Sequence, residues 1–151
     1  MNIINIYNRN VIVADQNSDV LTAAQLMRQH HVGTIVIVAD AVNSKKPIGI
    51  VSERDLVVKV LAKNVSAKDI TLHDTMTRDL VCLREDDDII DTIRVMCMEG
   101  VRRAPVINKQ GNLVGILAMD DLVEMLADDL SNLARLIERG RQNEKRIQCS
   151  Q

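Results

Sequence analysis

Two aspartates, Asp55 and Asp121, are the residues of this chain best suited to chemistry, because each follows a glycine-headed apolar run and lies in the first turn of a predicted helix. A carboxylate held there can accept hydrogen bonds from the vicinal hydroxyls of a ribose. Ser52 stands at the start of the first helix, where free backbone N–H groups and the helix dipole favour an anion such as phosphate. Arg54 can add a charge-assisted contact to that anion.

Helix capping is the competing interpretation of the same residues. Ser52 and Asp55 have the spacing of a capping box, in which a hydroxyl and an acid satisfy backbone N–H groups and no ligand is needed. The second position weakens this interpretation, because Ala118 cannot cap while Asp121 is still present three residues later. From the residues alone, both interpretations stay open.

The two aspartates belong to an internal repeat. Asp19 recurs as Asp88, 69 positions later, and the block 49–57 recurs at 115–123, 66 positions later. The difference places an insertion of three residues in the first copy, in the polar stretch 43–47, where a surface loop tolerates it. Two copies are too few for an open solenoid, so we expect them to pack on each other about a closed pseudo-twofold axis.

Hydrophobic periodicity predicts the same order of elements in each copy: strand, helix, strand, strand, helix. This order predicts an α+β protein. The first copy has predicted strands at 11–13, 34–38 and 48–51, with a helix at 19–30 and a closing helix from about Glu53. The second has strands at 80–83, 104–107 and 113–117, with a helix at 87–99 and a closing helix from about Met119.

The closing helix of the second copy is predicted to be longer than its counterpart. An apolar stripe with helical steps continues about two turns past what one repeat needs, through Leu122, Leu126, Leu130, Leu133 and Ile137. Such a stripe needs a partner, and we expect a homodimer that uses either this helix or the repeat helices. After Gly140 the chain is polar on every side, so we expect the tail to fray.

Composition excludes several classes of function. The net charge is −2 and Tyr7 is the only aromatic residue, so a basic footprint and a stacking platform for nucleic acid are both missing. The amino terminus has no basic or long apolar leader, and no apolar run approaches the ~18 residues of a membrane span. The sequence therefore predicts a cytoplasmic protein with neither nucleic acid nor membrane as partner.

Metal sites and catalytic groups are not expected either. The three cysteines lack C-x-x-C spacing, which disfavours a disulfide framework or a zinc site. His30 and His31 are neighbours about 100° apart on a helix and cannot chelate one metal. No nucleophile, base and orienting group stand together in the sequence, so we expect a binding protein, not an enzyme.

The repeat order and the segments 49–55, 74–79 and 100–106 together resemble a tandem pair of cystathionine-β-synthase (CBS) domains. The resemblance covers about residues 3–128 and implies two β-α-β-β-α repeats at 3–63 and 77–128, a linker at 64–76, and a helix extension and tail at 129–151. Such pairs commonly bind AMP, ADP or ATP, and in some members S-adenosylmethionine or NAD, in clefts between the repeats. The resemblance implies sensing, with no catalytic cofactor.

The ligand contacts expected from this resemblance fall into two clefts. Asp55 and Asp121 would bind the ribose, and adenine would lie between aliphatic side chains, since no aromatic is at hand. The first cleft would add Val11, Ile12, Thr34 and Ile35 to Ser52 and Arg54; the second would add Leu80, Val81, Arg102, Arg103, Ala104, Pro105 and Asp120. The arginine pair could reach phosphates or could be solvated surface charge. We expect the first cleft to bind more tightly, because the second has a methyl and an anion where the first has a hydroxyl and a cation.

We therefore expect a CBS pair that binds an adenine nucleotide and passes its bound state to an effector protein or across a homodimer by a population shift. Two alternatives remain open. The ligand could be a different adenosyl compound, such as S-adenosylmethionine or NAD. The chain could also be a ligand-free scaffold for dimerisation.

Overall fold

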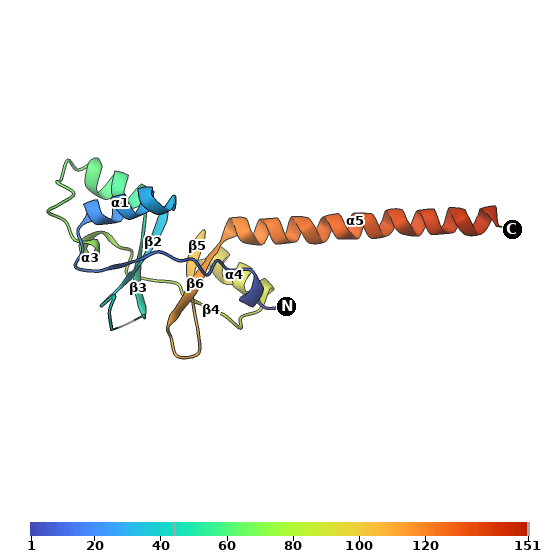
Figure 1. Ribbon diagram of the computed structural model, residues 1–151, viewed down its shortest axis with the longest axis horizontal. Coiled ribbons are helices and arrows are strands. Elements are labelled where there is room, and N and C mark those ends of the chain that lie inside the picture. The colour runs from blue at the N-terminus through green and yellow to red at the C-terminus, as the bar shows by residue number, and fades with distance from the viewer. Residues whose placement is uncertain (44, 151) are drawn as a thin grey trace. The chain divides into compact units, whose positions relative to one another are not determined.

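The computed structural model describes residues 1–43 and 45–150. It divides into two units, Met1–Leu117 and Ala118–Gln151. The first unit contains two three-stranded sheets with the strand orders β1-β2-β3 and β4-β5-β6 (Figure 1). This arrangement confirms the predicted α+β class and the two repeats.

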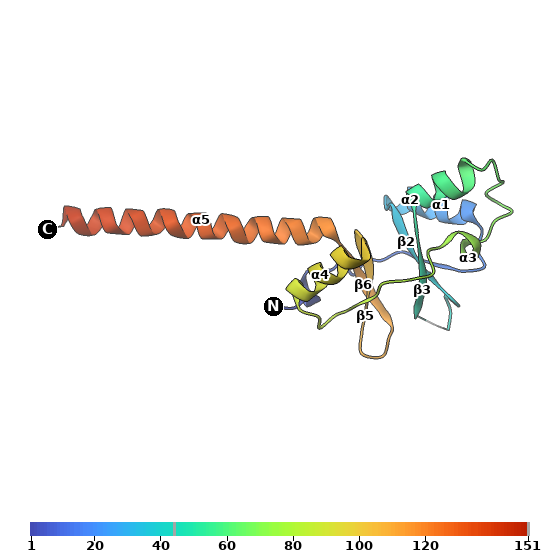
Figure 2. The same ribbon diagram turned by 180° about the vertical axis from the view of Figure 1, so that it is seen from behind.

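The first repeat has every predicted element. It comprises β1 (Val13–Asp15), α1 (Val20–His30), β2 (Thr34–Val38), β3 (Pro47–Ser52), α2 (Glu53–Leu56) and a π-helical turn, η2 (Val57–Leu61). α1 begins where the Asp19 carboxylate accepts the Thr22 backbone N–H at 2.7 Å, and it ends at His31, which has a left-handed φ of 54°. α1 lies beside β2 in both ribbon views (Figures 1 and 2).

The second repeat follows the same plan. It comprises β4 (Leu83–Arg84), α4 (Ile89–Glu99), β5 (Arg103–Ile107), β6 (Leu113–Ala118) and the start of α5 (Met119–Cys149). In both repeats the first strand begins later than predicted, at Val13 and Leu83. The chain before β1 still takes part in the sheet, because the Ile12 carbonyl accepts the Val36 N–H at 3.0 Å.

The two repeats exchange the segments that precede them. Asn8 pairs with Ile116 of β6, and Thr77 pairs with Ile50 of β3. These two bridges are equivalent, because the partners are related by the repeat offsets of 69 and 66 positions. The exchange gives the pair its pseudo-twofold character, since each repeat is completed by the chain that leads into the other.

Residues 64–76, predicted as a linker, contain the helix α3 (Leu72–Thr75). Leu72 is fully buried in the core of the first repeat, and its backbone N–H donates to the Ser18 carbonyl at 2.8 Å. Ile3 occupies the equivalent place before the first repeat, and it is fully buried too. This segment therefore packs as part of the first repeat, although it precedes the second.

The second unit is dominated by α5, a single helix of 31 residues. The predicted fraying after Gly140 is wrong, because the helix continues to Cys149. Arginine, glutamine, glutamate and lysine favour helix, and one glycine costs only about 1 kcal/mol. The helix ends where the Ser150 hydroxyl donates to the Arg146 carbonyl at 2.8 Å. None of the helices in the described part of the chain combines the length and apolar content needed to cross a membrane.

Candidate functional site

Asp55 is held at the start of α2 by a capping box. Its Oδ2 accepts the Ser52 backbone N–H at 2.8 Å and the Ser52 hydroxyl at 3.0 Å, and its own N–H donates to the Ser52 Oγ at 3.2 Å. The capping interpretation of these residues is therefore confirmed. Capping does not exclude a ligand, since a carboxylate has about four acceptor positions.

The other carboxylate oxygen of Asp55, Oδ1, forms an ion pair with Lys59. Its ammonium lies 3.1 Å from Asp55 Oδ1 and donates to the Thr75 carbonyl at 3.0 Å. Burial alone would raise the pKa of the Asp55 carboxyl, but hydrogen bonds from the Ser52 backbone, Lys59 and the Ser52 hydroxyl outweigh it and hold that pKa below its ordinary value. Asp55 is therefore an ionised hydrogen-bond acceptor, and Lys59 connects it to α3.

Asp121, the counterpart of Asp55, is less constrained. Its Oδ2 accepts the Ala118 backbone N–H at 2.9 Å. Ala118 offers only a methyl group, so the reciprocal half of the capping box is absent. Within residues 1–43 and 45–150, no hydrogen bond to Asp121 Oδ1 is formed, which leaves that oxygen open to a ligand.

Thr34 and Ser52 lie side by side in the first sheet, where β2 begins and β3 ends. They are paired across β2 and β3, and the Glu53 backbone N–H donates to the Gly33 carbonyl at 2.9 Å. Side chains alternate along a strand, so Thr34 shares a face with Val36 and Val38, whereas Ile35 points to the opposite face. The first sheet therefore presents Thr34 and Ser52 on one face, next to the start of α2.

A cavity of about 260 Å³ lies on that same face, between the two repeats. It is lined by Val11, Val13, Val38, Ala41, Lys45 and Leu113. Val13 is paired with Val36 and so shares its face. The Leu113 N–H donates to the Lys45 carbonyl at 2.8 Å, which joins β6 to the loop after β2. The walls are apolar with a single cation, a lining typical of a small-molecule site.

The remaining predicted residues of the first cleft are divided between core and surface. Ile35 is fully buried in the core of the first repeat, and Ile12 packs against that core. Arg54 is exposed at the start of α2. Ile35 lies inside because the alternation of β2 turns it, with Ile37, toward α1. Aliphatic contact with a ligand therefore falls to Val11, Val13 and Val38.

The residues predicted for the second cleft are likewise divided between core and surface. Ala104 and Pro105 are fully buried in β5. Leu80 and Val81 are half-buried just before β4, and the charged side chains Asp120, Arg102 and Arg103 are exposed. In the described residues none of these three charged groups forms an ion pair. The side chains of Arg102 and Arg103 are therefore accessible to an anion, but no ion pair in the described residues holds either of them in place.

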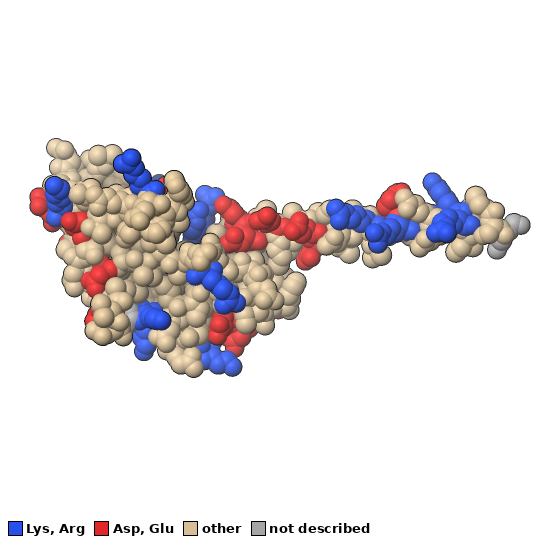
Figure 3. All heavy atoms as spheres, in the orientation of Figure 1, with Lys and Arg blue, Asp and Glu red and all other residues tan. Residues whose placement is uncertain are grey.

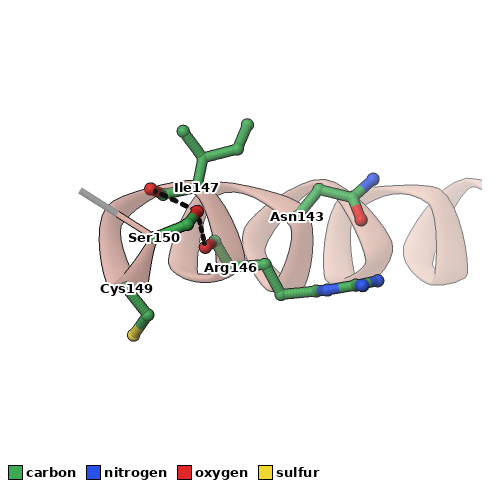
Figure 4. Close-up of a pocket in the computed structure, with 5 residues that line it drawn as sticks. All are labelled: Asn143, Arg146, Ile147, Cys149 and Ser150. Atoms are coloured by element: carbon green, nitrogen blue, oxygen red, sulfur yellow. Dashed lines mark hydrogen bonds between the residues drawn. The ribbon is translucent and has the colours of Figure 1, made fainter.

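A second void, of about 660 Å³, lies at the end of α5 (Figure 4). Its lining residues, Asn143, Arg146, Ile147, Cys149 and Ser150, all come from the last turns of one helix, and their side chains point in different directions. A binding site needs walls that face each other. This void therefore carries no ligand site.

Metal and thiol chemistry find no support in the described part of the chain. It contains no group of three or more histidine, cysteine or acidic side chains placed to hold a metal ion. Cys82 is half-buried, and burial raises the pKa of its thiol. A thiol with a raised pKa is a poor nucleophile.

Six residues of the site were not predicted: Lys59, Val13, Val38, Ala41, Lys45 and Leu113. Lys59 could have been found, because it stands four residues after Asp55, the spacing of an ion pair on a helix. Lys45 and Leu113 gave no signal, because they meet across the two repeats.

A family model for the CBS domain matches residues 3–62 and 67–128. The chain belongs to the CBS domain family. The two matched ranges confirm the prediction of a tandem CBS pair. Both carboxylates, Asp55 and Asp121, fall inside the matched ranges.

Relatives and solved structures agree with this assignment. The chain is 32% identical over 117 residues to an uncharacterised protein of Methanopyrus kandleri, covering 78% of this chain and 58% of that protein. It is 31% identical over 118 residues to an uncharacterised 17.7 kDa protein of Acidianus ambivalens, covering 78% of this chain and 68% of the relative. The CBS domain pair of protein MJ0100, solved with 5′-methylthioadenosine and S-adenosyl-L-methionine, superposes with a TM-score of 0.74 at 23% identity, covering 85% of this chain and 98% of that one. The last comparison shows the shared fold.

Proposed function

We propose that this CBS pair is a regulatory sensor that binds an adenine nucleotide, AMP, ADP or ATP, between its repeats. The observation that carries the proposal is the cavity of about 260 Å³ between the repeats, on the face of the first sheet that also presents Thr34 and Ser52. Its aliphatic walls suit a base, which they would hold by dispersion and apolar burial. The polar end of the same face suits the ribose and phosphate.

In this proposal Asp55 accepts the ribose hydroxyls and Arg54 contacts the phosphate. The Ser52 hydroxyl already serves the capping box, so it adds less to phosphate binding than the sequence suggests. The first cleft is therefore expected to exceed the second in nucleotide affinity by less than the sequence suggests. In the second copy Asp121 offers its open oxygen to a ribose hydroxyl.

The bound state is passed on through Lys59. A ribose hydroxyl at Asp55 Oδ1 competes with the Lys59 ammonium, which also holds the Thr75 carbonyl at 3.0 Å. Thr75 belongs to the segment that connects the repeats. Ligand binding therefore favours a different packing of that segment, which is a population shift. The proposed recipients are a second copy of the chain and an effector protein.

A different adenosyl ligand is the second candidate. The CBS pair of MJ0100 was solved with 5′-methylthioadenosine and S-adenosyl-L-methionine. The cavity favours this candidate as well, because most of its walls are apolar and one cation suffices for a carboxylate. A competition between AMP, ADP, ATP and these two compounds distinguishes the candidates.

Thermal melting tests the proposal. A ligand at 100 times its dissociation constant should stabilise the folded chain by about 2.7 kcal/mol, which is roughly 5 to 10 °C for a chain of this size. Asp55→Ala should lose the shift. Asp69→Ala is a matched control, because Asp69 is exposed and lies outside the site. If no adenosyl compound at millimolar concentration changes the melt, the chain is a scaffold and the proposal fails.

A further inference from the structure

The outer part of α5 carries an apolar stripe that the fold leaves exposed. Leu126, Leu130, Leu133 and Ile137 have exposed fractions of 45%, 69%, 58% and 59%. They follow one another in steps of four, three and four residues, the spacing of a coiled-coil seam. The residues that directly follow Leu126 and Leu133 are the alanines Ala127 and Ala134, so the side chains flanking the stripe are small there. Helices meet closely where the flanking side chains are small.

The charges of α5 are strongly segregated along its axis. Residues 119–130 contain five acidic side chains and no basic ones, whereas residues 131–149 contain five basic and two acidic ones. The net charges of the two halves are therefore −5 and +3. Figure 3 shows this division, with red spheres along the first half of the helix and blue spheres predominating toward its end.

We propose that α5 pairs in antiparallel orientation with α5 of a second copy of this chain. Packed helices lie 8 to 10 Å apart, about one Debye length at physiological salt, so the sign of the facing charge matters. A parallel pair would bring the two acidic halves together and the two basic halves together. An antiparallel pair brings each acidic half against a basic half. The charge pattern therefore selects both the occupant of the stripe and its direction.

The apolar pattern also selects a register. Placing Leu126 opposite the partner's Ile137 and Leu130 opposite the partner's Leu133 forms four apolar layers by symmetry. In the same register residues 119–130 of each helix lie alongside residues 133–144 of the partner, so each acidic half runs beside a basic half. Sliding the helices to the next antiparallel register would instead set Leu126 against Glu144 and Leu130 against Gly140. Sliding the helices seven residues the other way would place residues 126–130 of the two acidic halves alongside each other, so the first register, which keeps each acidic half beside a basic half, is the one proposed.

Disulfide trapping tests the orientation directly, in the full chain with Cys97→Ser and Cys149→Ser. A disulfide needs Cα atoms about 4.4 to 6.8 Å apart. In the proposed pair, two copies of residue 126 are separated by 11 residues along the axis, roughly 16 Å. A mixture of Leu126→Cys and Ile137→Cys chains should therefore give a cross-linked dimer under mild oxidation, and either variant alone should give none.

Each other outcome overturns the proposal. Efficient cross-linking of Leu126→Cys alone would show a parallel pair, and no cross-link in the mixture would show that α5 is not paired in this register. Sedimentation of Leu130→Glu/Leu133→Glu is the second measurement, with Ser131→Glu/Asn132→Glu as the control outside the stripe. The first variant should associate at least tenfold more weakly than the control. Equal association of the two would remove the stripe from the interface. The proposal does not depend on a bound nucleotide, so it can fail while the sensor function stands.

Discussion

Replacing Leu72 with alanine tests whether the segment between the repeats is a structural part of the first repeat. Leu72 is fully buried in the core that includes Met27 and Ile37, and its backbone is bonded to the loop before α1. A buried leucine replaced by alanine costs the lost apolar burial and the residual cavity, typically 2.7 to 5 kcal/mol, so we expect about 3 kcal/mol here. For a chain of this size that lowers the melting temperature by roughly 6 to 12 °C.

Urea unfolding at neutral pH is the assay, and a lower midpoint at an unchanged slope identifies a loss of stability. Ile3→Ala should cost a similar amount, because Ile3 is the equivalent residue before the first repeat and is also fully buried. Leu61→Ala is the control, since Leu61 is 72% exposed, and it should change stability by less than about 0.5 kcal/mol. If Leu72→Ala behaved like this control, 64–76 would be a passive linker and the exchange of segments would be refuted.

Further predictions concern the carboxylates and Lys59. Lys59→Met should tighten nucleotide binding a few-fold, about 1 kcal/mol, because it removes a competitor from Asp55 Oδ1; weaker binding in calorimetry would count against the proposed competition. Because folding lowers the pKa of Asp55, its contribution to stability is complete above about pH 4 and is lost as the pH falls through the folded value. Asp55→Asn should therefore lose less stability than the wild type between about pH 5 and pH 3, and equal urea midpoint shifts would contradict this. Asp121→Ala should weaken the second binding phase about tenfold and spare the first, which a two-site titration can resolve.

Local patterns in the sequence predicted most of the fold. α1 and β2 were found within one residue of their bounds, because helical and strand periodicity is strong at 19–30 and 34–38. The capping box at Ser52 and Asp55 was also readable, since it depends on two residues three positions apart. Packing between residues that are distant in the sequence was harder to predict. The exchanged segments could not be predicted because their partners lie more than 25 positions away in the sequence.

The candidate site also has one part that the sequence predicted and one part that it did not. The Asp55 end was predicted, because Ser52, Arg54 and Asp55 are close in the sequence. The cavity was predicted only through Val11. Its remaining walls depend on which face of β2 points toward α1, and on the meeting of Lys45 with Leu113 across the repeats. The persistence of α5 beyond Gly140 was not predicted, because residues 141–146 are polar on every side and offer no apolar face, whereas the helix continues to Cys149 on residues that favour helix.

The central claim, that this CBS pair binds an adenosyl ligand between its repeats, is tested most directly by titration calorimetry. AMP, ADP, ATP and S-adenosylmethionine are titrated into protein that has been unfolded, washed free of small molecules and refolded. At least one compound should bind with a saturable heat, Asp55→Ala should weaken the tighter phase at least tenfold, and Asp69→Ala should match the wild type. No saturable heat with any of the four compounds, or the same affinity in Asp55→Ala and the wild type, would contradict the account.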